Sequence, residues 1–101
     1  MSEPSSKVIH DPVGQEFSIL LPDTEERCKL LYSMQGGEVE LWHTEVPPAW
    51  RGRGLAGALA TTAMNWVVTQ PGTKALLSCS FVEKFVRDQN RETWNAVLCK
   101  S

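Results

Sequence analysis

The chain has 101 residues, enough for one small domain and too few for two independent hydrophobic cores. Ten Lys and Arg residues against twelve Asp and Glu residues give a net charge of −2, and 42% of the residues are hydrophobic. This composition is typical of a globular protein and excludes one that coats nucleic acid or an anionic membrane. Any anion must therefore be bound by a local site.

Cysteine spacing and the apolar segments restrict the class further. Cys28, Cys79 and Cys99 form no C-x-x-C pair, which excludes a zinc ribbon, so we expect free thiols and no metal. Residues 1–6 are expected to be a disordered lead before a single domain at 7–101. The lead has no apolar segment of a secretory signal, and Leu55 to Val68 is too short to span a bilayer. We expect a soluble, cytoplasmic protein without nucleic-acid or membrane partners.

Strands and helices are expected in a mixed order. Alternating apolar residues and turn signals predict four strands, at 7–10, 16–21, 27–34 and 38–46. An apolar stripe at helical spacing predicts a helix at 55–68, followed by a buried strand at 74–79 and short helices at 81–88 and 92–98. The order predicts an α+β fold in which an antiparallel β-meander leads into one β-α-β crossover.

The strand at 38–46 is the one expected to end at a site. Simple alternation places Val39 and Leu41 on one face together with His43 and Glu45. Pro47 and Pro48 then end the strand, because proline cannot donate to a sheet ladder.

The start of the long helix is the most informative segment. The sequence W-R-G-R-G-L-A-G contains no Ser, Thr, Asp or Asn to act as N-cap, so the first helical N–H groups lack a side-chain partner. Glycine lets an anion approach the backbone closely. Arg51 and Arg53 add positive charge where the helix dipole is already positive. These features predict a phosphate or pyrophosphate site.

Two motifs overlap at this segment. Gly52-x-Gly54-x-x-Gly57 matches the dinucleotide fingerprint, which requires its glycines directly after a strand and an acidic residue about 20 positions on. Here a loop with two prolines intervenes, and Ser78-Cys79-Ser80 contains no acid. The second motif, Arg51-x-x-Gly54-x-Ala56, is therefore the better match.

This second motif resembles the R-x-x-G-x-G/A motif of the GNAT acetyltransferase superfamily. The wider stretch H-T-E-V-P-P-A-W-R-G-R-G-L-A, with S-C-S-F-V after the helix, is similar to the small single-domain N-acetyltransferase-like branch. The resemblance covers nearly the whole chain. It implies a minimal GNAT-like fold whose fourth and fifth strands splay apart, and acetyl-CoA as the acyl donor.

The resemblance also implies roles for individual residues. Backbone groups of Thr44, Glu45 and Val46 are expected to pair with the pantetheine arm of acetyl-CoA. The pyrophosphate is expected to bind the segment formed by Arg51, Gly52, Arg53, Gly54, Leu55 and Ala56. Cys79, at the end of the fifth strand, is expected to face the sulfur of the cofactor, either as a contact or as a thiol that carries the acyl group.

Acyl transfer to an amine needs a base, because only the neutral amine attacks. His43 and Glu45 are the candidates, with His43 ranked slightly first; both also fit ordinary roles as surface strand residues. Phe85 stands where small relatives often carry a tyrosine that can protonate the leaving thiolate, and phenylalanine has no proton to give.

Three functions remain open at this point. The preferred one is an acetyl-CoA-dependent N-acetyltransferase acting on an unidentified amine, which could belong to a small molecule or a protein. The second is an acyl-CoA-binding module with little or no transferase activity, which Phe85 favours. The third is an interaction domain without a cofactor, which the uncapped Arg/Gly helix start disfavours.

Overall fold

The computed structural model describes residues 7–22 and 24–99, so the lead expected at 1–6 lies outside the described residues. The elements follow the predicted α+β order. They are β1 (Ile9–Asp11), β2 (Glu16–Leu20), β3 (Arg27–Gln35), β4 (Glu38–Glu45), the 3-10 helix η1 (Pro48–Trp50), α1 (Leu55–Thr69), β5 (Lys74–Leu77), α2 (Ser80–Gln89) and α3 (Glu92–Asn95).

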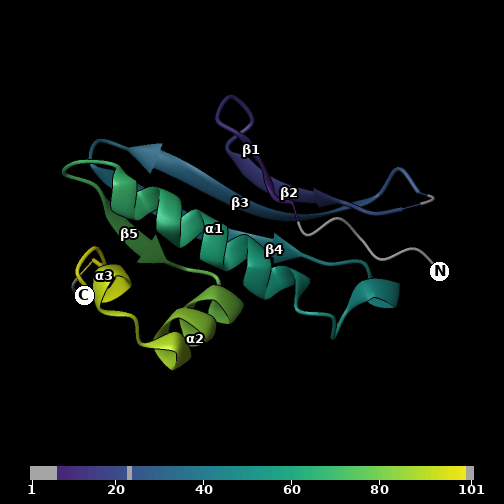
Figure 1. Cartoon of the computed structure of the whole chain (residues 1–101). Coiled ribbons are helices and arrows are strands. Elements are labelled where there is room, and N and C mark those ends of the chain that lie inside the picture. Colours follow the sequence, from purple (N-terminus) through teal and green to yellow (C-terminus); the bar gives the residue numbers. More distant parts are fainter. Residues whose placement is uncertain (1–6, 23, 100–101) are drawn as a thin grey trace.

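The five strands form one mixed sheet in the order β1-β2-β3-β4-β5 (Figure 1). The first four strands pair antiparallel, and β5 pairs parallel to β4 after the crossover through α1. The meander and the single β-α-β unit are therefore confirmed. The parallel pairing is short, because it joins only Glu38–Leu41 to Lys74–Leu77.

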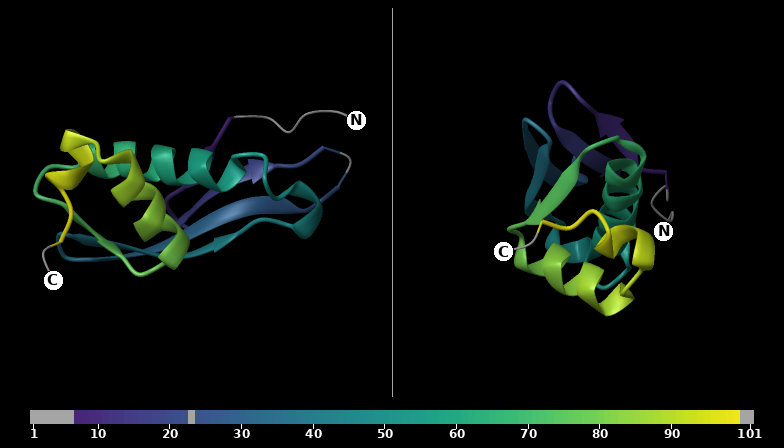
Figure 2. Two further views of the ribbon diagram at one scale, coloured as in Figure 1. Left: turned by 90° about the horizontal axis from the view of Figure 1, so that it is seen from below. Right: turned by 90° about the vertical axis from the view of Figure 1, so that its left-hand side faces the viewer.

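The helices lie on one side of the twisted sheet (Figure 2). Helix α1 packs across β2 and β3 and also contacts α2 and α3. In its apolar stripe Leu59, Ala63 and Val67 are fully buried against the inward side chains of the strands, and Ala56 and Trp66 are half-buried at its border. The predicted stripe is thus the centre of the core. Among the described residues, no helix has the length and apolarity needed to cross a membrane.

The face assignment in β4 was wrong from His43 onward. Leu41 pairs with Tyr32, but His43 pairs with Leu31, so Trp42 is an extra residue that β3 does not match. Such a β-bulge shifts the alternation by one position. His43 and Glu45 therefore lie on the sheet face opposite α1, while Thr44 shares the helix-side face with Leu41.

The prediction that the last helix continues to residue 98 was also wrong. Helix α3 ends at Asn95, and the chain then runs along the outer edge of β5. The N–H of Ala75 donates to the carbonyl of Val97 at 2.7 Å, and the N–H of Cys99 donates to the carbonyl of Ala75 at 2.9 Å. Residues 97–99 thus pair with the free backbone groups of the edge strand β5, and α3 keeps only four residues.

An aromatic cluster attaches β1 to the core. His10 stacks on Phe17, with ring centroids 4.2 Å apart, and meets Trp66 of α1 edge-on at 4.7 Å. His10 Nε2 lies 2.6 Å from the hydroxyl of Tyr32. Burial lowers the pKa of His10 below its ordinary value of 6.5, with a smaller opposing effect of Asp11.

This lowered pKa predicts that stability depends on pH through His10. The folded state favours the neutral imidazole, so the unfolded state binds more protons below pH 6.5 and the free energy of unfolding falls as pH drops through that region. Urea unfolding between about pH 7.5 and about pH 5.5 measures this slope. His10→Phe keeps an aromatic ring and should flatten the slope; an identical slope in this variant would contradict the account.

Candidate functional site

A cavity of about 930 Å³ opens where the end of β4 meets the start of α1. This volume is in the range of small-molecule sites. Its wall includes the end of the β2–β3 connection, the beginning of β3, the end of β4, the loop around η1, the first turn of α1 and Phe81 of α2. Two segments that the sequence marked separately, 43–46 and 51–56 with the exception of Arg53, thus line one cavity.

The start of α1 has the uncapped geometry that the sequence predicts. Gly54 is the N-cap residue, with φ 78° and no side-chain capping hydrogen bond. The first α-helical bond runs from the N–H of Ala58 to the carbonyl of Gly54 at 3.0 Å, so the N–H groups of Leu55, Ala56 and Gly57 precede the helical ladder. Gly52 and Gly54 both have positive φ, and a Cβ built at either would meet nothing within 4 Å. The backbone of this turn is open to a ligand.

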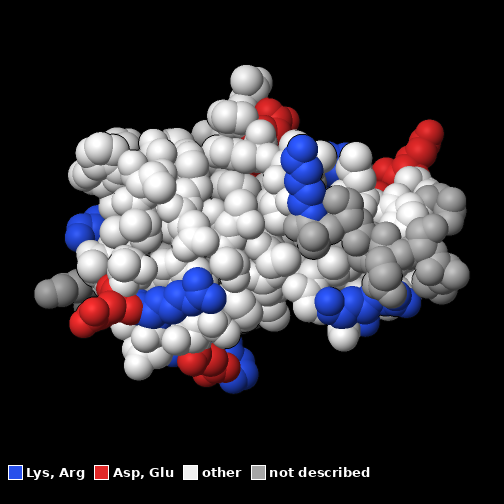
Figure 3. All heavy atoms as spheres, viewed as in Figure 1, with Lys and Arg blue, Asp and Glu red and all other residues white. Residues whose placement is uncertain are grey.

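The two arginines of the loop differ in their contacts. Arg51 lines the cavity and donates from Nε to the carbonyl of Val46 at 3.0 Å, which ties the loop to the end of β4. The guanidinium of Arg53 lies 4.6 Å from the ring centroid of Trp50, and Arg53 is absent from the cavity wall. Figure 3 shows Lys and Arg atoms gathered around η1 and the following loop, with no Asp or Glu atoms beside them on that face. The helix N-terminus and Arg51 make this the positive end of the cavity, whose wall elsewhere also includes Glu25, Glu26 and Glu45.

Strands β4 and β5 separate at Leu41. Its carbonyl accepts hydrogen bonds from both Ser78 and Cys79 at 3.1 Å, and β4 continues past this point without β5. Beyond the separation, Thr44 Oγ1 and Cys79 Sγ lie 3.3 Å apart. Thr44 lines the cavity, whereas Cys79, half-buried at the N-cap of α2, is absent from the wall. The thiol lies behind Thr44.

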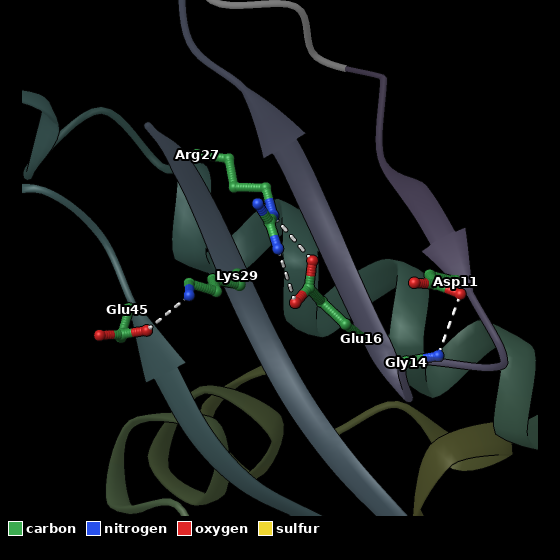
Figure 4. A network of polar contacts seen from close by, with 6 residues as sticks. All are labelled: Asp11, Gly14, Glu16, Arg27, Lys29 and Glu45. Carbon is green, nitrogen blue, oxygen red and sulfur yellow. Dashed lines mark hydrogen bonds and ion pairs between the residues drawn. The ribbon is translucent and has the colours of Figure 1, made fainter. Parts of the chain in front are cut away.

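On the sheet face opposite α1, Lys29 and Glu45 lie side by side on neighbouring strands, and Figure 4 shows the ion pair between them. Lys29 Nζ is 3.4 Å from Glu45 Oε2, and His43 Nε2 is 3.8 Å from Glu45 Oε1. All three residues line the cavity. Sequence reasoning missed Lys29, because a lysine at an outward strand position is indistinguishable from surface charge until the register pairs it with Glu45.

Phe85 has a packing role. It contacts Trp94 and Phe81, with ring centroids 6.4 and 5.9 Å away, and is absent from the cavity wall. A Cβ on Gly57 would lie 2.9 Å from Phe85 Cε1, so the glycine permits the close approach of α1 and α2. No group of three or more His, Cys, Asp or Glu side chains that could hold a metal ion occurs within 7–22 and 24–99.

A family model and several individual proteins match most of this chain. Residues 16–97 match the family described as GCN5-related N-acetyl-transferase. The chain is 44% identical to "Protein NATD1" of Xenopus tropicalis over 89 residues, covering 85% of this chain and 81% of the relative. It is 43% identical to the Danio rerio protein of that name and 41% to the Homo sapiens one, each over 83 residues. Those two alignments cover 81% of this chain and 74% and 73% of the respective relatives.

The contact between Thr44 and Cys79 predicts coupled effects on stability. Thr44→Val and Cys79→Ala should each lower the free energy of unfolding by about 0.5–1.5 kcal/mol, the usual net value of one hydrogen bond. The double variant should lose less than the sum, because neither partner is left unpaired. Urea unfolding of the four proteins measures this, and strictly additive losses would show that the two groups do not interact.

Proposed function

The chain belongs to the GCN5-related N-acetyltransferase family, and we propose that it transfers the acetyl group of acetyl-CoA to an amine. The observation that carries the proposal is the single cavity that joins the uncapped start of α1 to the free end of β4. Acetyl-CoA needs both parts, because its pyrophosphate is an anion and its pantetheine arm is an extended chain with amide groups. The chemistry of the cavity wall and the open space in front of it fit these two parts of acetyl-CoA.

The positive end of the cavity is proposed to bind the pyrophosphate. Backbone N–H groups from Gly52 to Ala56, and the dipole of a helix without an acidic first turn, attract a phosphate. The Arg51 side chain holds this loop against Val46 and adds charge to the wall. Arg53, through its stacking on Trp50, is proposed to stiffen the loop and contribute long-range charge.

The free edge of β4 is proposed to bind the pantetheine arm. Thr44, Glu45 and Val46 lie beyond the last pairing with β5, so this side of the strand has no neighbouring strand. A chain with amide groups can occupy the place of the missing strand, as in β-strand addition. The carbonyl of Val46 already accepts from Arg51, which leaves its second lone pair for a ligand.

The base is proposed to be His43 or Glu45. Both lie on the outer face, line the cavity and are partly exposed, so an acceptor amine can reach them. The substrate ammonium group loses a proton to this base, and the neutral amine attacks the thioester carbonyl, where a backbone N–H near Glu45–Val46 stabilises the oxyanion. The C–S bond then breaks, and the thiolate takes up the second proton of the nitrogen and leaves as CoA thiol. Cys79 is proposed to support the site through Thr44, and the transfer is direct.

A second candidate is an acyl-CoA-binding module with little or no transferase activity. Phe85 favours it, because this side chain packs between helices and offers no proton to a leaving thiolate. An acceptor screen separates the two candidates: release of CoA that depends on an amine supports the transferase, and tight binding with no release for any amine supports the module.

The pyrophosphate site predicts that Gly54→Glu abolishes binding of acetyl-CoA. Gly36, in the β3–β4 turn, is the matched control, because it also has positive φ and open space around a built Cβ. Both glutamate variants should lose about 1–2 kcal/mol of stability through backbone strain. Only Gly54→Glu should weaken binding by more than about tenfold in calorimetric titration; equal affinities would contradict the site.

The separation of β4 from β5 predicts the effect of deleting Trp42. The deletion removes the unmatched residue and preserves the pairing of Leu41 with Tyr32 and of His43 with Leu31. We expect a folded protein whose β4 runs straight beside β5, with acetyl-CoA binding weakened by more than about tenfold, because the bulge bends the strand. Calorimetry and urea unfolding together test this, and a stable deletion variant with normal affinity would refute it.

A further inference from the structure

We propose that Lys29 is a self-acetylation site, an inference that rests on the proposed use of acetyl-CoA. Lys29 is the one lysine in the cavity wall among the residues the structure describes. Its side chain is 34% exposed, so the amine is accessible from the cavity. It belongs to β3, one strand away from the segment proposed to hold the acyl donor.

The position of the Lys29 amine relative to Glu45 carries the inference. An acceptor amine must come within about 2.6–3.2 Å of the base that takes its proton, with looser distances common before substrate binds. Lys29 Nζ is already 3.4 Å from Glu45 Oε2, because the two residues are direct cross-strand partners. Lys29 thus presents an amine where an external acceptor would have to present its own.

The surrounding charges favour this pairing. The neighbouring cation, Arg27, is bound to Glu16 through two hydrogen bonds of 2.8 and 3.1 Å (Figure 4). Glu45 therefore has Lys29 and His43 as its neighbouring cationic or ionisable groups. The His43 ring stacks on Trp42 at a centroid distance of 5.5 Å. The lysine, the carboxylate and the imidazole occupy one end of the cavity.

The transfer is balanced with acetyl-CoA as the acetyl donor. The Lys29 ammonium group first loses one proton to solvent through Glu45. The neutral amine then attacks the thioester carbonyl carbon, an N–C bond forms, and the C–S bond breaks. The second proton lost by the nitrogen passes to Glu45 and then to the departing thiolate, which leaves as CoA thiol. The product amide carries no charge, so Glu45 loses its ion-pair partner and becomes available to an external ammonium group.

Two other lysines provide internal controls. Lys84 is 79% exposed on α2, pairs with Asp88 and lies outside the cavity wall. Lys74 donates to the carbonyl of Ala96 at the far end of β4 and β5. Chemical acetylation by free acetyl-CoA should modify both at rates that follow exposure and rise linearly with acetyl-CoA concentration.

The test uses the full chain with deuterated acetyl-CoA, and mass spectrometry to measure the acetylation rate of each lysine. We expect the rate at Lys29 to saturate with acetyl-CoA and to fall more than tenfold with excess CoA or in Glu45→Gln, while the rate at Lys84 is unaffected. Lys29→Arg keeps the positive charge and should abolish the saturable adduct. A Lys29 rate that rises linearly and ignores CoA, or an adduct on Cys79 alone, would overturn the inference.

Calorimetric titration of the same protein with acetyl-CoA separates this inference from the function on which it rests. Binding with saturable acetylation of Lys29 supports both. Binding without modification of Lys29 overturns the self-acetylation site and leaves the proposed function intact. Absence of binding overturns both.

Discussion

The separation of β4 from β5 is the constraint on which the rest of the site depends. The carbonyl of Leu41 accepts two consecutive N–H groups, those of Ser78 and Cys79, and at this point the parallel pairing ends. The bulge at Trp42 turns β4 in the same region. If β5 continued to pair with β4 beyond Leu41, the N–H and carbonyl groups on that side of β4 would bond to β5, and β4 would have no free edge there. The break therefore gives the end of β4 a free edge for a ligand.

Charge is divided between the two ends of the cavity. The helix end combines an unopposed dipole, three N–H groups ahead of the helical ladder and Arg51, so it attracts an anion. At the sheet end, Lys29 is paired with Glu45, and His43 lies beside them. One end is suited to the phosphates of a nucleotide, and the other to an amine that must lose a proton. The proposed reaction requires both ends.

Local features of the sequence were sufficient to predict the uncapped start of α1, on which the proposed phosphate site rests. Two signals need no knowledge of distant contacts: the absence of a capping side chain and the presence of Gly52 and Gly54. The structure has the uncapped turn that these signals imply. The apolar stripe of α1 likewise predicted the core. These features depend on backbone chemistry within one or two turns of chain.

The sheet end could not be predicted in this way. An unmatched Trp42 looks like any strand residue until β3 is placed beside it, so the faces of His43 and Thr44 were exchanged. The partnership of Lys29 with Glu45 depends on the register between two strands, and the last segment follows the edge of β5 where helical propensity favoured α3. The expectation that Cys79 faces the sulfur of the cofactor stays a prediction; in the structure the thiol lies behind Thr44 and outside the cavity wall, where the proposed role is support through Thr44.

The most direct test of the central claim is the set of backbone amide shifts in a ¹⁵N-labelled sample titrated with CoA. If the phosphates bind at the start of α1 and the pantetheine arm along β4, the largest shifts should fall on Gly52 to Gly57 and on Thr44 to Val46, with small shifts in β1 and α3. Shifts confined to other elements, or none at millimolar CoA, would contradict the account.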